Sequence, residues 1–346
     1  MFEKLIIFFL ITLFFTRNLI ILLKKKNFFI DQPNFSFHKK FIINNNNNVP
    51  LCGGFILLIA TFFFFDNNIT SLQLKLFSFF IFFLGFLSDI NKINKPTLRL
   101  IIQIFLVLLF VIILDIKILD LRSEFLNRIL ALHVASYFFV TFCILIVING
   151  GNFIDGINLN LISYYLAVIL ILIYLSVFKN LELNENIYIL FIISIVLAFY
   201  NYTAKLFMGD SGAYLLSFLS SFYLIDFYGL NKFISPYFIC LLLWYPAFET
   251  FFSIVRRLKK KNLVSNPDVL HLHQLIYLFI SKKFKKKVNS SQISILINTY
   301  NLIIFFICSY YIDLTKFQLV FIFLNIAIYL AIYIKLFNIM NNYTKF

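Results

Sequence analysis

Apolar stretches recur from one end of the chain to the other, separated by short polar segments. Each is close to the roughly twenty residues that a helix needs to cross the hydrocarbon core of a bilayer. The stretches do not alternate polar and apolar positions as a membrane barrel does, and a backbone in lipid must satisfy its own hydrogen bonds, so we predict helices. The predicted helices cover 3–23, 50–65, 69–87, 98–117, 129–148, 161–178, 187–203, 212–229, 233–255, 292–312 and 317–338.

This pattern predicts an all-α integral membrane protein with about 10–11 transmembrane helices. The segment 50–65 is short and leads almost directly into the next one, which is why the count has two values. We expect a single polytopic domain over residues 1–346, with the polar motifs between 31 and 277 and C-terminal helices over 292–338. The first apolar stretch has no small-residue cleavage site, so we expect it to remain as a helix.

Composition supports this class, since 62% of the residues are hydrophobic and only 13% are charged. The net charge of +15 could indicate a nucleic-acid partner, but its distribution gives a simpler explanation. With eleven helices, eighteen lysines and arginines fall in loops on one side and about six in or beside the opposite loops. That asymmetry predicts that the basic side is cytoplasmic, and no nucleic acid is needed. The basic loops are 24–49, 88–97, 149–160, 204–211 and 256–291.

Polar clusters with glycines lie in the same five loops. They are DQP at 31–33 with His38-Lys39 and Pro50, then Ser88-Asp89 with Lys92, NGGNFIDGIN at 149–158, FMGDSG at 207–212, and NPDVLHLHQ at 266–274. Each has a plain explanation when taken alone: Asp210 could cap a helix, and Asp89 and Lys92 could form an exposed pair. Acidic residues at membrane ends are costly, so their occurrence in one set of loops favours a shared site on the cytoplasmic face. Carboxylates mixed with lysine, arginine and histidine suit a Mg²⁺-bound diphosphate.

At these residues the sequence resembles the polyprenyl-phosphate N-acetylhexosamine-1-phosphate transferase family, glycosyltransferase family 4, over about 31–277. The segments that carry the resemblance are DQP, GFLSDINK followed by Arg99, NFIDG at 152–156, FMGDSG, and YPAFETFFSIVRR leading to NPDVLHLHQLIY. The sequence differs from the usual pattern of the family in four places, one of which is Thr203-Ala204-Lys205, where a proline usually precedes the fourth motif. Ser88 and Asn158 stand where acids are frequent, and Gln274 replaces a frequent histidine.

The resemblance implies transfer of a HexNAc-1-phosphate from a UDP-sugar to polyprenyl (undecaprenyl) phosphate, with release of UMP, at the start of a lipid-linked glycan such as O-antigen. It implies a bacterial inner membrane location, Mg²⁺ or Mn²⁺ as cofactor, and leaves a homodimer open. The implied catalytic residues are Asp89, Asp155 and Asp210. The implied metal ligands are Asp210 and Asn152, and the implied substrate-binding residues are Asn152, Lys92, Lys39, Arg257, His271 and His273.

Three alternatives stay open from the sequence. A phospho-N-acetylmuramoyl-pentapeptide transferase of peptidoglycan synthesis shares the main motifs, although the histidine segment favours the branch that initiates O-antigen. A membrane transporter would also combine many helices with acids, but it would place them near the bilayer midplane. An inactive family member is the third alternative, on the basis of Ser88.

Overall fold

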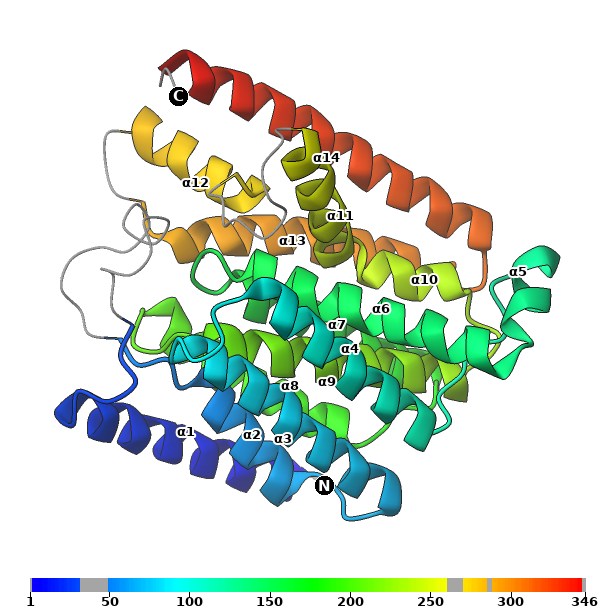
Figure 1. The fold of residues 1–346 in the computed structure, drawn as a ribbon, viewed down its shortest axis with the longest axis horizontal. Coiled ribbons are helices and arrows are strands. Elements are labelled where there is room, and N and C mark those ends of the chain that lie inside the picture. The colour runs from blue at the N-terminus through cyan, green and yellow to red at the C-terminus, as the bar shows by residue number, and fades with distance from the viewer. Residues whose placement is uncertain (1, 32–48, 260–269, 285–287, 344–346) are drawn as a thin grey trace.

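The computed structural model describes residues 2–31, 49–259, 270–284 and 288–343, and in this part of the chain helices joined by short connections are the regular structure, apart from one isolated β-bridge (Figure 1). The helices are α1 (Phe2–Lys25), α2 (Gly53–Phe64), α3 (Ile69–Asp89), α4 (Pro96–Ile113), α5 (Glu124–Leu130), α6 (His133–Ile154), α7 (Asn160–Lys179), α8 (Asn186–Tyr202), α9 (Gly209–Leu230), α10 (Pro236–Leu242), α11 (Trp244–Lys259), α12 (Leu272–Lys283), α13 (Ser290–Ser309) and α14 (Thr315–Tyr343).

The prediction of an all-helical, multi-pass membrane protein is confirmed. Eight of the described helices are long and apolar enough to cross a membrane, or nine if the bent pair α10–α11 counts as one span. The helices α2 and α8 are apolar but shorter. Large apolar side chains such as Phe14, Phe105 and Phe323 are exposed on α1, α4 and α14. A surface of that kind is suited to lipid rather than to water.

The segment 233–255, which we expected as one helix, forms two helices that are bent by 71° at Leu243. Pro246 causes the break, because it has no N–H to donate to the carbonyl of Leu242 and its ring crowds the preceding turn. The Leu242 carbonyl instead accepts a hydrogen bond from the Tyr164 hydroxyl at 2.8 Å. The short helices α5 and α12 were also absent from the predicted set.

Local sequence explains where several helices begin. Asn68 caps α3 by accepting a hydrogen bond from the Ser71 backbone N–H at 2.8 Å, and Asn289 does the same for α13 through Ser291 at 3.1 Å. Pro96 opens α4, at a position where a missing N–H has no cost. These capping residues lie in the polar breaks between apolar stretches, so they fix the ends of the helices.

Helix α9 is the buried centre of the bundle and packs against α2, α3 and α6 (Figure 1). Glycines allow two of these close approaches. A Cβ on Gly85 of α3 would lie 2.4 Å from the Ser211 Cα, and one on Gly54 of α2 would lie 2.7 Å from the Gly212 nitrogen. Both separations are shorter than carbon and nitrogen atoms tolerate. The glycines therefore let the ends of α2 and α3 meet the first turn of α9.

Candidate active site

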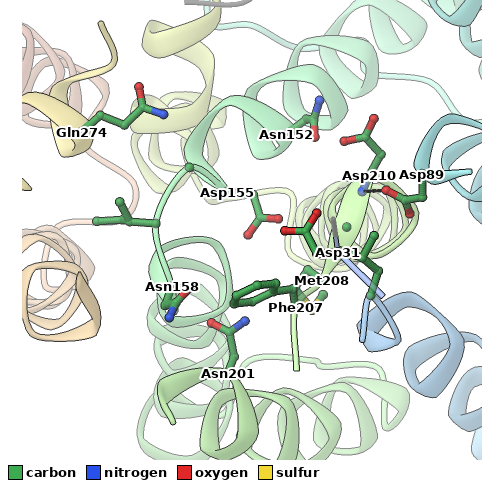
Figure 2. Close-up of a pocket in the computed structure, with 14 residues that line it drawn as sticks. Asp31, Asp89, Asn152, Asp155, Asn158, Asn201, Phe207, Met208, Asp210 and Gln274 are labelled. Atoms are coloured by element: carbon green, nitrogen blue, oxygen red, sulfur yellow. Dashed lines mark hydrogen bonds between the residues drawn. The ribbon is translucent and has the colours of Figure 1, made fainter. Parts of the chain in front are cut away.

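A pocket lies where α3 and α6 end and where α7 and α9 begin (Figure 2). Segments that are far apart in the sequence line it, and each of the five loops that we predicted to share one side contributes at least one residue. Leu51 and Asn201 also line it, from the predicted helices 50–65 and 187–203. The prediction that these loops meet is therefore confirmed for the described residues, while the side of the membrane on which they lie stays a prediction. The lining residues are Asp31, Leu51, Asp89, Asn152, Asp155, Gly156, Ile157, Asn158, Asn201, Phe207, Met208, Gly209, Asp210 and Gln274.

The first loop reaches the pocket through backbone hydrogen bonds. Ile30 and Pro50 form an antiparallel bridge, in which the Asp31 N–H donates to the Val49 carbonyl at 2.9 Å. The Pro50 carbonyl in turn accepts from the Phe207 N–H at 3.0 Å. These bonds bring Asp31 beside the FMGDSG segment. The residues between, 32–48, lie outside the described part of the chain.

Asp89 caps α9 from another helix. Its Oδ1 accepts the backbone N–H of Asp210 at 2.7 Å, and its Oδ2 accepts the backbone N–H and the hydroxyl of Ser211 at 3.0 and 2.7 Å. The first N–H groups of a helix have no partner within it, and a negative charge there is favourable. Gly209 has a φ of +69°, and a Cβ on it would lie 2.7 Å from Asp89 Oδ2, so a glycine is required at this contact.

Asp210 follows directly and lines the same pocket. Its Oδ2 lies 2.6 Å from Arg99 Nη1 and accepts the Ser88 hydroxyl at 2.6 Å. Arg99 Nη1 also contacts the Ser88 hydroxyl. The carboxylate is thus paired with a cation from the first turn of α4 and with the residue that precedes Asp89.

The NGGNFIDGIN segment forms the end of α6 and the turn into α7. Asp155 is the C-cap of α6, its backbone N–H donates to the Gly151 carbonyl at 3.1 Å, and Asn152 lies one turn earlier on the pocket side. A pocket residue that we did not predict, Asn201, holds this turn in place. Its side chain accepts the Leu159 N–H and donates to the Leu206 carbonyl at 2.9 Å.

Planar side chains form a stack behind this turn. The Arg257 guanidinium lies 5.3 Å from the centre of the Phe153 ring, Phe153 stacks on His271 at 5.3 Å, and His271 stacks on His273 at 5.7 Å. The stack links the NFIDG segment to the histidine segment. Arg257, His271 and His273 are all buried and are not among the residues that line the pocket. Gln274 is the lining residue from that segment.

Glu249 orients this stack from within α11. It is fully buried, and its two oxygens contact His271 Nδ1 at 2.8 Å and the Tyr329 hydroxyl of α14 at 2.7 Å. Glu249 was not among the site residues predicted from the sequence. The available signal was an acid inside an apolar helix, which is costly unless it has a partner.

His273 is held in its neutral form. Burial, followed by the neighbouring His271, lowers the pKa of His273 to about 3, although Glu249 acts in the opposite direction. Its Nδ1 lies 3.1 Å from the Tyr245 hydroxyl, and its Nε2 has no hydrogen-bonding partner among the described residues. That nitrogen lies 2.3 Å from where a Cβ on Gly156 would be. The imidazole therefore lies against the turn that carries Asp155.

The predicted site residues lie in four different settings. The pocket brings together Asp89, Asn152, Asp155 and Asp210. Arg257, His271 and His273 lie in the layer behind its wall, and Lys92 is exposed after the end of α3. Lys39 lies outside the described residues. Arg99 was noted in the sequence only as the residue that follows the second motif, yet it contacts Asp210 directly.

The donor set of the pocket suits a hard cation such as Mg²⁺, because four carboxylates and the amide side chains of Asn152 and Asn158 supply oxygen atoms. Within the described residues, no three His, Cys, Asp or Glu side chains are already assembled as a metal cluster. Mg²⁺ usually binds through one or two carboxylates together with waters and substrate phosphates, so such a cluster is not required.

Comparison with known proteins agrees with these motifs. Residues 71–228 match the family described as glycosyl transferase family 4. A curated relative, the probable undecaprenyl-phosphate N-acetylglucosaminyl 1-phosphate transferase of Bacillus subtilis (strain 168), is 32% identical over 142 residues. That stretch is 38% of this chain and 37% of the relative, so the match spans well under half of either protein. The matched family segment contains Asp89, Arg99, Asp155 and Asp210.

Proposed function

We propose, from the match of residues 71–228 to glycosyl transferase family 4, that the protein transfers a sugar 1-phosphate from a UDP-sugar to a polyprenyl phosphate in the membrane. The sugar is a HexNAc, and the product begins a lipid-linked glycan of the cell envelope such as O-antigen. The proposal extends to this chain the activity named for the Bacillus subtilis relative.

In the proposed reaction a phosphate oxygen of the lipid attacks the phosphorus that carries the sugar. A new phosphoanhydride forms as the P–O bond between this phosphorus and the oxygen that bridges it to the UMP phosphorus breaks, so that UMP leaves with the bridging oxygen and the lipid becomes polyprenyl-diphosphate-sugar. One phosphoanhydride replaces another, so the enzyme must mainly align two polyanions and reduce their repulsion. A phosphate monoester has a second pKa near 6, so the lipid phosphate needs little help from a base.

The observation that carries the proposal is the meeting of four aspartates from four separate segments in one pocket at the end of an apolar bundle. Asp89 is the last residue of α3, Asp155 follows the end of α6 and Asp210 is in the first turn of α9. Ionisable groups of a transporter are expected near the middle of the membrane. A pocket at the helix ends suits a lipid phosphate at the headgroup level and a nucleotide that cannot enter the bilayer.

Asp210 and Asn152 are the residues that would hold Mg²⁺ or Mn²⁺, which would neutralise charge on the phosphates. Asp89 positions Asp210 through the cap of α9, and Asp155, which lines the same pocket, orients the UDP-sugar. Lys39 and Lys92 would supply cations for the phosphates. Arg257, His271 and His273 would support the NFIDG turn in its binding conformation. The excess of lysine and arginine in the loops around the pocket supports a cytoplasmic position for it, since basic loops favour that side.

The test is an assay on the full-length protein in membranes or detergent. Polyprenyl phosphate is supplied with UDP-GlcNAc, UDP-GalNAc or UDP-MurNAc-pentapeptide, and UMP release is followed with and without Mg²⁺. We expect UMP and a lipid-linked sugar from a UDP-HexNAc only when the lipid phosphate and the divalent ion are both present. Asp210→Asn protein prepared in the same way is the control for contaminating enzymes.

Two results would contradict the proposal. Turnover of UDP-MurNAc-pentapeptide alone would assign the protein to the peptidoglycan branch. An absence of UMP release with every donor, from folded protein in the presence of Mg²⁺ and lipid phosphate, would refute transferase activity. In that case the comparison of Ser88→Asp with wild type is informative, because a gain of activity would identify Ser88 as the inactivating residue.

A further inference from the structure

Asp210 already has a cation beside it that belongs to the protein. Arg99 Nη1 lies 2.6 Å from its Oδ2, and the Ser88 hydroxyl donates to that same oxygen at 2.6 Å. The other oxygen, Oδ1, receives neither donor. In the proposed function this same carboxylate holds the divalent ion. An ion bound to this carboxylate would lie close to the guanidinium, and the two positive charges would repel each other.

The pair between Arg99 and Asp210 is partly open to solvent, since the two side chains are 20% and 29% exposed. Ion pairs with that degree of exposure are weak, because water and salt compete with them. A divalent cation in the pocket can therefore replace the guanidinium without a large barrier from lost pairing. By contrast, the capping contacts of Asp89 on Asp210 and Ser211 do not involve the Asp210 carboxylate, so this exchange leaves the helix end in place.

We propose that Arg99 is the resident counter-ion of Asp210, that a divalent cation displaces it, and that the released guanidinium then binds a substrate phosphate. This inference rests on the proposed function. Four carboxylates line the pocket, and without a counter-charge they would repel an anionic diphosphate. Arginine offers two parallel donors to a phosphate, so its release would add a binding group when the metal arrives. Metal and nucleotide would then bind cooperatively.

A purely structural role for Arg99 makes the opposite prediction. If the guanidinium only holds the Asp210 side chain in position, its removal should weaken metal binding. If it competes with the ion, its removal should strengthen metal binding. The sign of the change therefore separates the two roles, and it can be measured without turnover.

The experiment uses full-length purified protein in detergent, with free Mn²⁺ followed by electron paramagnetic resonance. We expect Arg99→Gln to bind Mn²⁺ about fivefold more tightly than wild type, which corresponds to about 1 kcal/mol for a partly exposed pair. Asp210→Asn should lose this binding. Isothermal titration with UMP at saturating Mn²⁺ should show weaker binding to Arg99→Gln by at least about tenfold, the loss expected when a charged hydrogen bond is removed.

Arg122→Gln is the matched control, because Arg122 also pairs with an aspartate, Asp120, at 3.5 Å and is partly exposed. Arg122 lies beyond the C-terminal end of α4, an 18-residue helix about 27 Å long, whereas Arg99 is in its first turn. Its Mn²⁺ and UMP affinities should equal those of wild type. If Arg99→Gln does not fold, Arg99→Lys takes its place: the charge is kept, so Mn²⁺ affinity should stay near wild type while UMP binding falls.

Equal or weaker Mn²⁺ binding by Arg99→Gln would overturn the inference, as would unchanged UMP binding. Wild-type protein that binds no Mn²⁺ would also overturn it. The UMP-release assay on the same preparation then shows whether the proposed function stands without it.

Discussion

The carboxylate of Asp89, at the end of α3, accepts the backbone N–H of Asp210, at the start of α9, at 2.7 Å. One predicted catalytic acid thus fixes the position of another. Both Asp89 oxygens are occupied by the first turn of α9. This geometry favours a positioning role for Asp89, whereas Asp210 presents its side chain to the pocket.

Asp89→Asn should lower the rate of UMP release by at least about 10²-fold, because the displaced cap moves Asp210 away from the developing charge. An amide keeps one acceptor but turns an N–H₂ group toward donors on Ser211. Asp120→Asn is a suitable control, since Asp120 also accepts a backbone N–H, that of Arg122, at 2.7 Å. A wild-type rate for Asp89→Asn would remove Asp89 from the site.

Asp210→Asn should also reduce UMP release by at least about 10²-fold, but with little loss of stability. Among the described residues this carboxylate has one ion-pair partner, the partly exposed Arg99, and such pairs contribute about 0–1 kcal/mol. Thermal unfolding in detergent measures the change in stability. An active Asp210→Asn protein, or one that no longer folds, would contradict this assignment.

Gly85→Ala should separate α3 from α9 and so impair both folding and activity. The added Cβ would lie 2.4 Å from the Ser211 Cα, a clash of the kind that costs about 1–3 kcal/mol in a packed core. The matched variant is Gly229→Ala, where a Cβ meets nothing within 4 Å at the other end of α9. It should be neutral or slightly stabilising, because alanine favours helices. Equal behaviour of the two variants would refute the proposed close packing.

Acid should destabilise the protein through His273. Its pKa is lowered to about 3 in the folded state, so the unfolded chain takes up this proton first. Neutral His273 makes its full contribution to the free energy of unfolding above pH 6.5. That contribution is lost as the pH falls toward 3, by up to about 1.4 kcal/mol per pH unit. Unfolding temperatures of wild type and His273→Gln, measured from pH 7 to pH 4, test this. The unfolding temperature of the wild type should fall more steeply with decreasing pH than that of His273→Gln. Parallel curves of unfolding temperature against pH would contradict the prediction.

The chain of contacts at the site shows which parts of it could be predicted. Asp89, Asp155 and Asp210 were found from the sequence because each lies in a polar motif at the end of an apolar stretch. The capping of Asp210 by Asp89 was not, because it depends on two helices separated by more than a hundred residues. Glu249 and Asn201 were missed, since a single polar residue in an apolar segment does not identify its partner.

The sequence by itself determined the membrane class, the helical fold and the grouping of the polar loops. These properties depend on the length of apolar segments and on the distribution of charge, both of which are local. The tertiary structure alone decided that Arg99 pairs with Asp210, that the histidines lie behind the pocket wall and that α10 and α11 are bent. Such contacts depend on how close two helices approach, and that distance is set by glycines, prolines and packing across the whole bundle.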